Sequence, residues 1–282
     1  MKNPRRGPTI YDVAEQAGVA TSTVSRAFSN PDRVNATTRE HVLDVAKRLG
    51  YRPNPLARSL PSGRTRTVAL LVADITNPHY FEMIRGAERR AKAAGLTLIL
   101  VNTEESAQTE RNQIERLSRS VDGFILASSR MSDETIRGLQ ADYNIALVSR
   151  ELDGLPSVEV DHVEGCQQIV QHLASLGHRS VVFLAGPRVS WLALHRWRAI
   201  FGAAKRLGMR ATKLGPFSPT VSSGGAAADA ALGCGATAVV AYNDLLAIGA
   251  LRRFADRGVA VPGDISVVGF DDIFASDLCT PG

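Results

Sequence analysis

Apolar side chains recur at helical spacing in three short segments near the start of the chain. The apolar residues of segment 10–17 stand three or four positions apart, and those of segments 24–28 and 42–49 repeat this spacing. Such spacing places apolar side chains along one face of an α-helix. Thr9 fits an N-cap that accepts amide hydrogens of the first turn, and Gly18 suits the positive φ that often ends a helix. The pattern predicts three short helices around one small core.

The predicted second helix follows the first after a tight turn that contains glycine. It begins at Thr21 or Ser22 and ends near Ser29, before the turn-forming sequence Asn-Pro-Asp. A third helix is expected to begin with a capping box from Thr37 to Glu40. Helix, turn and helix form the helix-turn-helix arrangement, whose second helix enters the major groove of DNA. Short hydroxyl side chains and one arginine point away from the predicted core and suit phosphate oxygens and base edges: Thr21, Ser22, Ser25, Arg26 and Ser29.

From Thr67 onward, short apolar runs alternate with segments of helical spacing. Strands are expected at 68–72, 96–101, 121–127, 144–148, 181–184, 237–241 and 265–269. Helices are expected at 81–94, 106–119, 165–176, 191–207, 226–232 and 245–255. Strict alternation favours parallel sheets with right-handed crossovers, and two series of it predict two doubly wound subdomains with a cleft between them. Ligands of such sheets bind beyond the carboxyl ends of the strands.

The charge of the chain divides at the same place. Residues 1–66 carry 12 Lys and Arg against 5 Asp and Glu, whereas the remainder carries 21 against 23. The first part therefore has a net charge of +7 and the rest has −2. A basic, helical end joined to a nearly neutral body is typical of nucleic-acid-binding proteins. A basic disordered tail is the alternative that composition alone allows, and the helical spacing argues against it.

Signals of several other protein classes are missing from the sequence. No motif of a serine hydrolase, a zinc protease or a nucleotide-binding loop occurs, and the 6 His and 3 Cys are scattered without metal-ligand spacing. We therefore expect no enzyme activity, no metal and no cofactor. No apolar run approaches the ~18 residues that span a bilayer, and the polar N-terminus excludes an ordinary secretory signal. The cytoplasm is the expected location, without a membrane partner.

Specific motifs occur along the whole chain. Residues 9–30 have the sequence TIYDVAEQAGVATSTVSRAFSN, and residues 50–57 have the sequence GYRPNPLA. Further motifs stand at 77–81, 121–123, 176–179, 185–187, 242–244 and 264–272. Together they resemble the lac repressor/galactose repressor (LacI/GalR) family of transcription regulators. The resemblance implies a helix-turn-helix headpiece and an effector-binding core of the periplasmic-binding-protein type, in which a small molecule such as a sugar changes the affinity for an operator.

The resemblance also assigns DNA-contacting roles to residues of the headpiece. It implies that Thr21 and Ser22 take the base-reading positions of the recognition helix, and that Ser29 lies near the phosphates. Arg26 would contact a base edge, and a purely phosphate role is its alternative. The full set of implied DNA contacts is Thr9, Ile10, Tyr11, Thr21, Ser22, Ser25, Arg26, Ser29, Asn54, Ala57 and Leu60. The expected partner is a pseudo-palindromic double-stranded DNA operator, bound by a homodimer.

A short hinge is predicted after the headpiece. Asn54 followed by Pro55 marks a helix start, but a helix of about six residues is not stable alone in water. In the family this segment pairs across the dimer and inserts a leucine into the minor groove, at the position of Leu60 here. Pro61 stands where the family usually has a basic residue, and an ordinary linker is the alternative.

Six effector-contacting residues follow from the same resemblance: Tyr80, Phe81, Ser149, Arg196, Asn243 and Asp271. Each lies near the end of a predicted strand or in the first turns of a helix, which agrees with a site in the cleft. Aromatic faces stack on a sugar or base ring, and the arginine, amide and carboxylate suit hydroxyl groups. Ser149 stands where aspartate is common, which weighs against a simple monosaccharide. A solvated surface charge is the alternative for Arg196, and capping of the next helix is the alternative for Asp271 with Asp272.

The predicted fold class is a small all-α helix-turn-helix headpiece plus an α/β core of two doubly wound parallel-sheet subdomains. The headpiece is expected at residues 1–53, the hinge helix and linker at 54–66, and the core at 67–282, with subdomains 67–161 and 162–282. Relative to the family pattern, the C-terminal part of the core is expected to be missing. The expected function is effector-controlled repression of transcription, and a cytoplasmic sugar-binding protein with a non-functional headpiece is the alternative.

Overall fold

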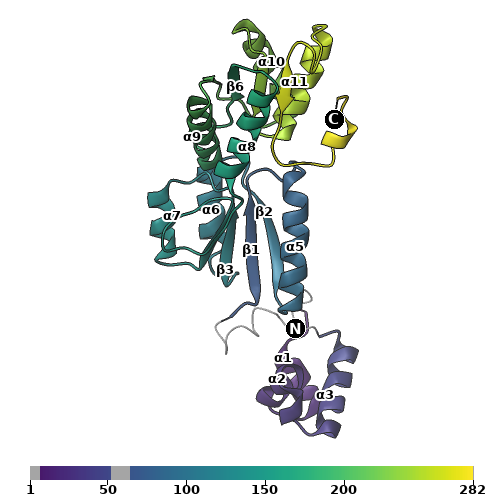
Figure 1. Ribbon diagram of the computed structural model, residues 1–282. Coiled ribbons are helices and arrows are strands. Elements are labelled where there is room, and N and C mark those ends of the chain that lie inside the picture. Colours follow the sequence, from purple (N-terminus) through teal and green to yellow (C-terminus); the bar gives the residue numbers. More distant parts are fainter. Residues whose placement is uncertain (1–6, 52–63, 282) are drawn as a thin grey trace. The chain divides into compact units, whose positions relative to one another are not determined.

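The computed structural model describes residues 7–51 and 64–281 of the chain (Figure 1). The chain divides into two compact units between Arg66 and Thr67. The three predicted hinge contacts, Asn54, Ala57 and Leu60, lie outside the described residues. Within the described ranges, every helix is too short or too polar to span a bilayer.

The N-terminal unit packs short helices around a core of valines. Its elements are α1 (Ile10–Ala17), α2 (Thr21–Ser29), the 3-10 turn η1 (Pro31–Arg33) and α3 (Ala36–Leu49). Side chains from all three α-helices meet in the core, where Val13, Val24, Val42 and Val45 are fully buried. The helix-turn-helix arrangement predicted from the apolar spacing is therefore confirmed.

Local hydrogen bonds fix the ends of α1 and α3. The amide of Asp12 donates to the Thr9 hydroxyl at 3.5 Å, and the amide of Thr9 donates to the Asp12 carboxylate at 2.7 Å. These two bonds form the predicted capping box. Gly18 and Gly50 end the two helices with φ of 64° and 67°, a backbone conformation that glycine adopts without steric cost.

The start of α2 agrees with the prediction, whereas the cap of α3 differs from it. The Asn35 side chain accepts a hydrogen bond from the amide of Thr37 at 3.0 Å, and α3 begins directly after Asn35. The expected capping box from Thr37 to Glu40 is therefore wrong, because an asparagine two residues earlier supplies the acceptor. α2 begins at Thr21, and its N-cap Ala20 offers no side-chain acceptor.

The first half of the larger unit is a parallel sheet with helices on both faces. Its strand order is β2-β1-β3-β4-β5, with every neighbouring pair parallel. The strands are β1 Thr67–Val72, β2 Thr97–Asn102, β3 Gly123–Ala127, β4 Ile145–Val148 and β5 Ser157–Val158. One face contacts α5 (His79–Ala93), and the other contacts α6 (Ala107–Leu117) and α7 (Asp133–Gln140) (Figure 1).

The second half of this unit repeats the plan with the strand order β7-β6-β8-β9, again all parallel. The strands are β6 Ser180–Leu184, β7 Arg210–Leu214, β8 Ala238–Ala241 and β9 Ser266–Val268. The helices are α8 His162–Ser175, α9 Trp191–Arg206, α10 Gly224–Gly233 and α11 Asp244–Asp256, with 3-10 turns η2 Val221–Ser223 and η3 Ser276–Leu278. Two doubly wound parallel-sheet subdomains, the predicted fold class, are confirmed.

Besides its 3-10 turns, the larger unit contains one α-helix and two strands that were not predicted: α7, β5 and β7. The edge strand β7 has the sequence Arg-Ala-Thr-Lys-Leu, so it lacks the continuous apolar run expected of a buried strand. The two residues of β5 are too few to form a pattern. α5 begins at His79 instead of Phe81, where the Asn77 side chain accepts a hydrogen bond from the amide of His79 at 3.1 Å.

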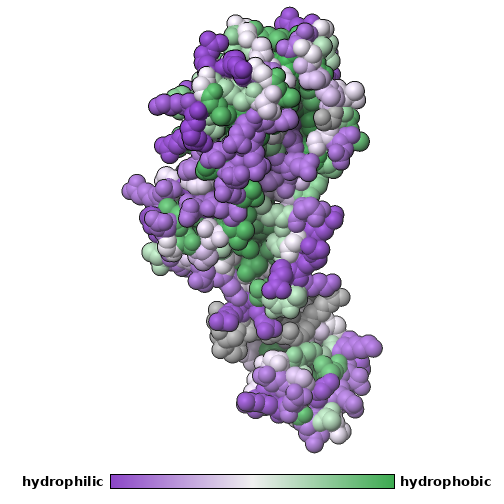
Figure 2. Space-filling model, viewed as in Figure 1, coloured by the Kyte–Doolittle hydropathy of each residue, from purple (hydrophilic) through white to green (hydrophobic). Residues whose placement is uncertain are grey.

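The face of the first sheet that contacts α5 is covered only in part. Beyond the helix a groove remains, and its floor includes Val68, Ile125 and Ala146. Figure 2 shows hydrophobic side chains at the surface over these strands, between hydrophilic helices. The groove lies along the sheet, away from the carboxyl ends of the strands.

Candidate functional site

The outward side of α2 carries the short polar side chains that the resemblance assigns to DNA. Ser22, Ser25, Arg26 and Ser29 are exposed and Thr21 is half-buried, whereas Val24 and Ala27 on the opposite side enter the core. The Ser29 hydroxyl donates a hydrogen bond to the Ser25 carbonyl at 2.9 Å. Helical geometry therefore places all five predicted α2 residues on one solvent-facing surface.

The three predicted contacts at the start of α1 differ in how much surface they offer. Tyr11 is 70% exposed, whereas Ile10 packs against the core. The Thr9 hydroxyl donates to the Asp12 carboxylate at 2.7 Å as part of the helix cap. Tyr11 thus presents the most surface, and Thr9 and Ile10 also hold the helix in place.

Basic side chains are distributed over the surface of the N-terminal unit. Arg26, Arg33, Arg39, Lys47 and Arg48 are all exposed. Among residues 7–51 and 64–281, none of them forms an ion pair with an acidic side chain. Exposed cations without acidic partners are available to bind the phosphates of a nucleic acid.

A pocket lies between the two halves of the larger unit, at the carboxyl ends of their strands. It is lined by Asn77, His79, Tyr80, Glu105, Ser128, Arg130, Leu192, Arg196, Pro219, Tyr242, Asn243 and Asp271. The cavity volume is about 20 Å³, which is enough for water but not for a sugar ring. A ligand of that size enters only when lining side chains or the two subdomains move.

The structure brings four of the six predicted effector contacts together in this pocket: Tyr80, Arg196, Asn243 and Asp271. Phe81 is 45% exposed on α5, and it does not line the pocket. Ser149 is buried directly after β4, where its amide donates to the Val158 carbonyl at 2.8 Å, and it does not line the pocket either.

Arg196 is a buried part of the pocket wall. Its side chain is 4% exposed, so the alternative of a solvated surface charge is wrong. The guanidinium donates to the Tyr242 carbonyl, lies 3.5 Å from the Asp271 carboxylate, and stacks 4.0 Å from the centre of the Phe270 ring. Its Nε is buried without a hydrogen-bond partner among the described residues. A buried N–H group without an acceptor lowers the stability of the folded state.

Asp271 also belongs to the pocket. Its Oδ1 lies 3.5 Å from Arg196 and 3.6 Å from Nδ1 of His79. Burial raises the pKa of Asp271, and the charges of His79 and Arg196 oppose that rise. The following η3 has Ala275 as its N-cap without a side-chain bond, so the capping alternative for Asp271 and Asp272 is wrong.

The loop that carries Asp271 is strained and is held by the start of α11. Asp271 and Asp272 have φ of 105° and 51°, a backbone region that side chains other than glycine rarely adopt. The Asp244 carboxylate accepts from the amide of Ile273 at 3.0 Å, and its own amide donates to the Phe270 carbonyl at 2.8 Å. These two bonds keep the strained turn directed at the pocket.

Asn243 and Tyr80 complete the predicted part of the pocket, and both have partners within the chain. The Asn243 side chain caps α11 by accepting from the amide of Leu246 at 3.1 Å, and it donates to the Pro219 carbonyl at 3.3 Å. Tyr80 is 4% exposed, and its hydroxyl contacts Ser128. Burial raises the pKa of Tyr80, so this hydroxyl stays protonated at neutral pH.

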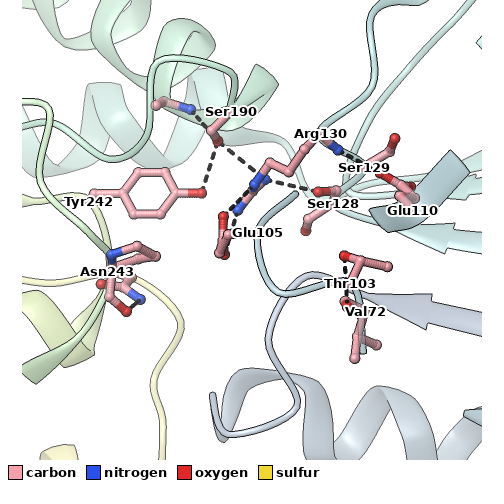
Figure 3. Close-up of polar contacts among 12 residues, drawn as sticks. Val72, Thr103, Glu105, Glu110, Ser128, Ser129, Arg130, Ser190, Tyr242 and Asn243 are labelled. Atoms are coloured by element: carbon pink, nitrogen blue, oxygen red, sulfur yellow. Dashed lines mark hydrogen bonds and ion pairs between the residues drawn. The ribbon is translucent and has the colours of Figure 1, made fainter. Parts of the chain in front are cut away.

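Sequence reasoning missed a polar network that crosses the pocket (Figure 3). The Glu105 carboxylate binds Arg130 through two bonds, Nε to Oε2 at 2.5 Å and Nη2 to Oε1 at 2.9 Å. Nη1 of Arg130 lies 3.5 Å from the Ser190 hydroxyl, which in turn lies 2.9 Å from the Tyr242 hydroxyl. Glu105, Arg130 and Tyr242 each follow a predicted strand closely, and that position is the signal that could have identified them.

Two buried charges fix the loop on which Arg130 stands. The Glu110 carboxylate of α6 accepts from the amide of Arg130 at 3.0 Å, and burial raises the pKa of Glu110. Arg150 donates to the Met131 carbonyl at 2.6 Å and pairs with Asp133. The loop is therefore held from two sides by groups that do not themselves line the pocket.

No group of acidic, histidine or cysteine side chains in the described ranges has a geometry that would hold a metal ion. The three cysteines differ in environment: Cys166 is buried, Cys279 is intermediate and Cys234 is exposed. The pocket instead offers hydroxyls, an amide and paired charges, which can hydrogen-bond to a polar ligand.

Comparison with known protein families agrees with this division of the chain. Residues 9–54 match the family described as "Bacterial regulatory proteins, lacI family". Residues 65–279 match the family described as "Periplasmic binding proteins and sugar binding domain of LacI family". Each match coincides with one of the two units of the structure.

Individual proteins show the same similarity over nearly the whole chain. The HTH-type transcriptional regulator RegA of Clostridium saccharobutylicum is 35% identical over 285 residues, covering 97% of this chain and 85% of the relative. The HTH-type transcriptional repressor CytR of Escherichia coli (strain K12) is 32% identical, covering 99% and 84%. A crystal structure of the lac repressor dimer bound to operator and the anti-inducer ONPF is similar with a TM-score of 0.82 and 27% identity, covering 96% and 84%. The chain belongs to the LacI family of bacterial transcription regulators.

Proposed function

We propose that this regulator is a cytoplasmic repressor that binds a pseudo-palindromic operator as a homodimer and responds to a small, sugar-like effector. The observation that carries the proposal is the exposed polar face of α2 on a packed, basic helix-turn-helix unit. The similarity to CytR, a repressor, and to the operator-bound lac repressor dimer supports it. Two-fold symmetry of the dimer would impose the symmetry of the two half-sites.

The proposal assigns base reading to Thr21, Ser22 and Arg26. Their exposure on one side of α2 supports this role, as the recognition helix of such units lies in the major groove. Further contacts to the backbone or groove are assigned to Thr9, Ile10, Tyr11, Ser25, Ser29, Asn54, Ala57 and Leu60. The headpiece would span residues 1–53 and the hinge residues 54–66.

The effector is assigned to the pocket between subdomains 67–161 and 162–282. Tyr80, Arg196, Asn243 and Asp271 line it, and their mixture of aromatic, cationic, amide and carboxylate groups suits a polar ring compound. Phe81 and Ser149 lie outside the pocket wall, and the proposal gives them a contact only after the subdomains move. The small cavity volume supports a coupling between ligand binding and such a movement.

Selection of bound DNA from a random pool tests the DNA-binding half of the proposal. We expect the intact chain to select a two-fold symmetric sequence, and footprinting to show two protected half-sites. The variant Arg26→Ala should bind its selected site less tightly while its affinity for random DNA changes much less, because a lost base contact costs ~1–3 kcal/mol of discrimination. Equal losses on both DNAs would limit Arg26 to phosphate contact. Absence of any selected sequence would favour a small-molecule-binding protein with a non-functional headpiece.

A further inference from the structure

The charged side chains that line the pocket form two oppositely charged pairs. Arg130 binds Glu105 through two hydrogen bonds, and Arg196 lies 3.5 Å from Asp271. The remaining titratable groups of the wall are His79, which contacts Asp271, and the phenols Tyr80 and Tyr242. The carboxylates therefore compensate the positive charge of both guanidinium groups.

The first pair leaves Arg130 with little capacity for an anionic ligand. Its Nε and Nη2 face Glu105, and its Nη1 donates to the Ser128 carbonyl at 2.9 Å. Each guanidinium nitrogen thus already has an acceptor. Glu105 is the more exposed partner, at 24% against 3% for Arg130, so its carboxylate remains within reach of an incoming group.

The weakest bond of the network lies between the two subdomains. Nη1 of Arg130 and the Ser190 hydroxyl are 3.5 Å apart, at the outer limit of a hydrogen bond. Figure 3 shows the hydroxyls of Ser190 and Tyr242 and the Glu105 carboxylate grouped around the guanidinium of Arg130. A ligand hydroxyl that replaces the long Ser190 contact could accept from Nη1 of Arg130, while an adjacent hydroxyl donates to the partly exposed Glu105 carboxylate. No short bond of the network is broken.

A buried arrangement of this kind contributes little to stability. Removing charges from water costs about as much as their pairing returns, and apolar side chains of similar volume often stabilise a fold more. Here Glu110 and Arg150 add further buried charges only to hold the Arg130 loop. Because these buried charges add little stability, we infer that they hold Arg130 in place for recognition of a ligand.

We propose that the pocket selects an uncharged, hydroxyl-rich ligand, and that the Arg130–Glu105 pair discriminates against phosphorylated or carboxylated forms of it. Adjacent hydroxyls of the ligand bind the guanidinium and the carboxylate of the pair. A phosphate ester would meet two arginines whose charges are already compensated, and it would add an unpaired negative charge to a buried site. The inference rests on the proposed effector role of this pocket.

The test compares the intact chain with the variant Glu105→Gln, using inorganic phosphate as the probe. Glutamine keeps the size of the side chain but leaves the Arg130 charge uncompensated. Calorimetric titration at constant ionic strength should show no saturable phosphate binding to the original chain. The variant should bind phosphate at least about tenfold more tightly, as one charge-assisted hydrogen bond contributes ~1.5–3 kcal/mol.

Glu104→Gln is the matched control, since Glu104 is the exposed neighbour of Glu105 and does not line the pocket. This variant has the same change of net charge and should behave as the original chain does. The double variant Glu105→Gln/Arg130→Gln should lose the phosphate affinity that the single variant gains. Equal phosphate affinity of the two single variants would overturn the proposal.

The original chain provides a second, independent measurement that does not depend on how the variants fold. Matched pairs such as D-glucose and glucose 6-phosphate, or D-ribose and ribose 5-phosphate, are titrated in the same way. Tighter binding of any phosphate ester than of its neutral parent would overturn the proposal. Operator binding is measured in the same samples, so loss of the regulator function is distinguished from a wrong ligand class.

Discussion

At the scale of single residues, buried charged groups define the pocket between the two subdomains. Arg196 illustrates this, because the sequence allowed either a surface charge or a ligand contact, and only burial in the fold decides between them. Its stacking on Phe270 and its bond to the Tyr242 carbonyl join segments that are about 50 to 75 positions away in sequence. Periodicity places an arginine on a helix, but it does not reveal which distant carbonyl or ring will surround the side chain.

Truncation of Arg196 should therefore lower the stability of the fold. We expect Arg196→Ala to lower the free energy of unfolding by about 3 kcal/mol, because it leaves the buried Asp271 with only His79 as a charged partner. Denaturant titration measures this change. Arg198→Ala is the control, since Arg198 is exposed on the same helix and its loss should cost no more than about 0.5 kcal/mol. Equal effects of the two substitutions would contradict the burial of Arg196.

Two further residues near the pocket should influence how stability depends on pH. Burial lowers the pKa of His162 to about 4, and the charges of Arg196 and His79 act in the same direction. Burial raises the pKa of Asp244 to about 6, and Asp271 adds to the rise. As the pH falls below about 6.5, the unfolded chain gains a proton at His162 that the folded chain does not bind, so stability decreases. At Asp244 the folded chain gains the proton first, between about pH 6 and 3.8, so stability increases.

Substitutions at these two positions should change the acid loss of stability in opposite directions. His162→Gln should make the decrease in the free energy of unfolding between pH 6.5 and 4 shallower. It removes a group that takes up a proton in this range only in the unfolded chain. Asp244→Asn should make this decrease steeper, because it removes a group that takes up a proton more readily in the folded chain than in the unfolded chain. Urea titrations at several pH values measure both slopes. A change in the same direction for both variants would show that one of the two pKa shifts has the wrong sign.

At the scale of secondary-structure elements, the sequence predicts those features that depend on bonds between near neighbours in the chain. The capping box at Thr9 and the glycine ends of α1 and α3 were predictable, because each depends on neighbours within four residues. The parallel strands with continuous apolar runs were predictable for the same reason. The edge strand β7 was not, since its hydrogen-bond partner β6 makes it a strand and its alternating polar sequence does not.

The start of α3 provides a test at this scale, because two neighbouring side chains compete for the role of cap. We expect Asn35→Ala to increase amide hydrogen exchange in the first turn of α3, since its side chain holds the Thr37 amide at 3.0 Å and such a cap contributes ~1 kcal/mol. Thr37→Ala should leave the exchange rates nearly unchanged. A larger effect of Thr37→Ala would contradict the Asn35 cap and favour the capping box from Thr37 to Glu40.

At the scale of the whole molecule, the excess positive charge lies in the first 66 residues, whereas the charged side chains of the pocket neutralise one another. The basic part, residues 1–66, has a net charge of +7, whereas the four charged side chains that face each other in the pocket are paired. Sequence motifs were sufficient for the two-part organisation and for four pocket residues. The Arg130–Glu105 pair was not predictable, because loops that follow β2 and β3 meet only after the parallel sheet has formed.

This separation predicts that salt acts on only one of the two binding functions. Each phosphate contact releases condensed counterions, so a dimer with six or more such contacts should lose at least about 1,000-fold in operator affinity between 50 and 200 mM salt. The affinity for a neutral sugar that releases the operator should change by less than about twofold, because no net charge is brought into the pocket. Fluorescence anisotropy on labelled operator and calorimetry on the sugar, in the same buffers, measure the two slopes. Parallel slopes would mean that the effector binds through uncompensated charge, contrary to the pairing of Arg130 and Arg196.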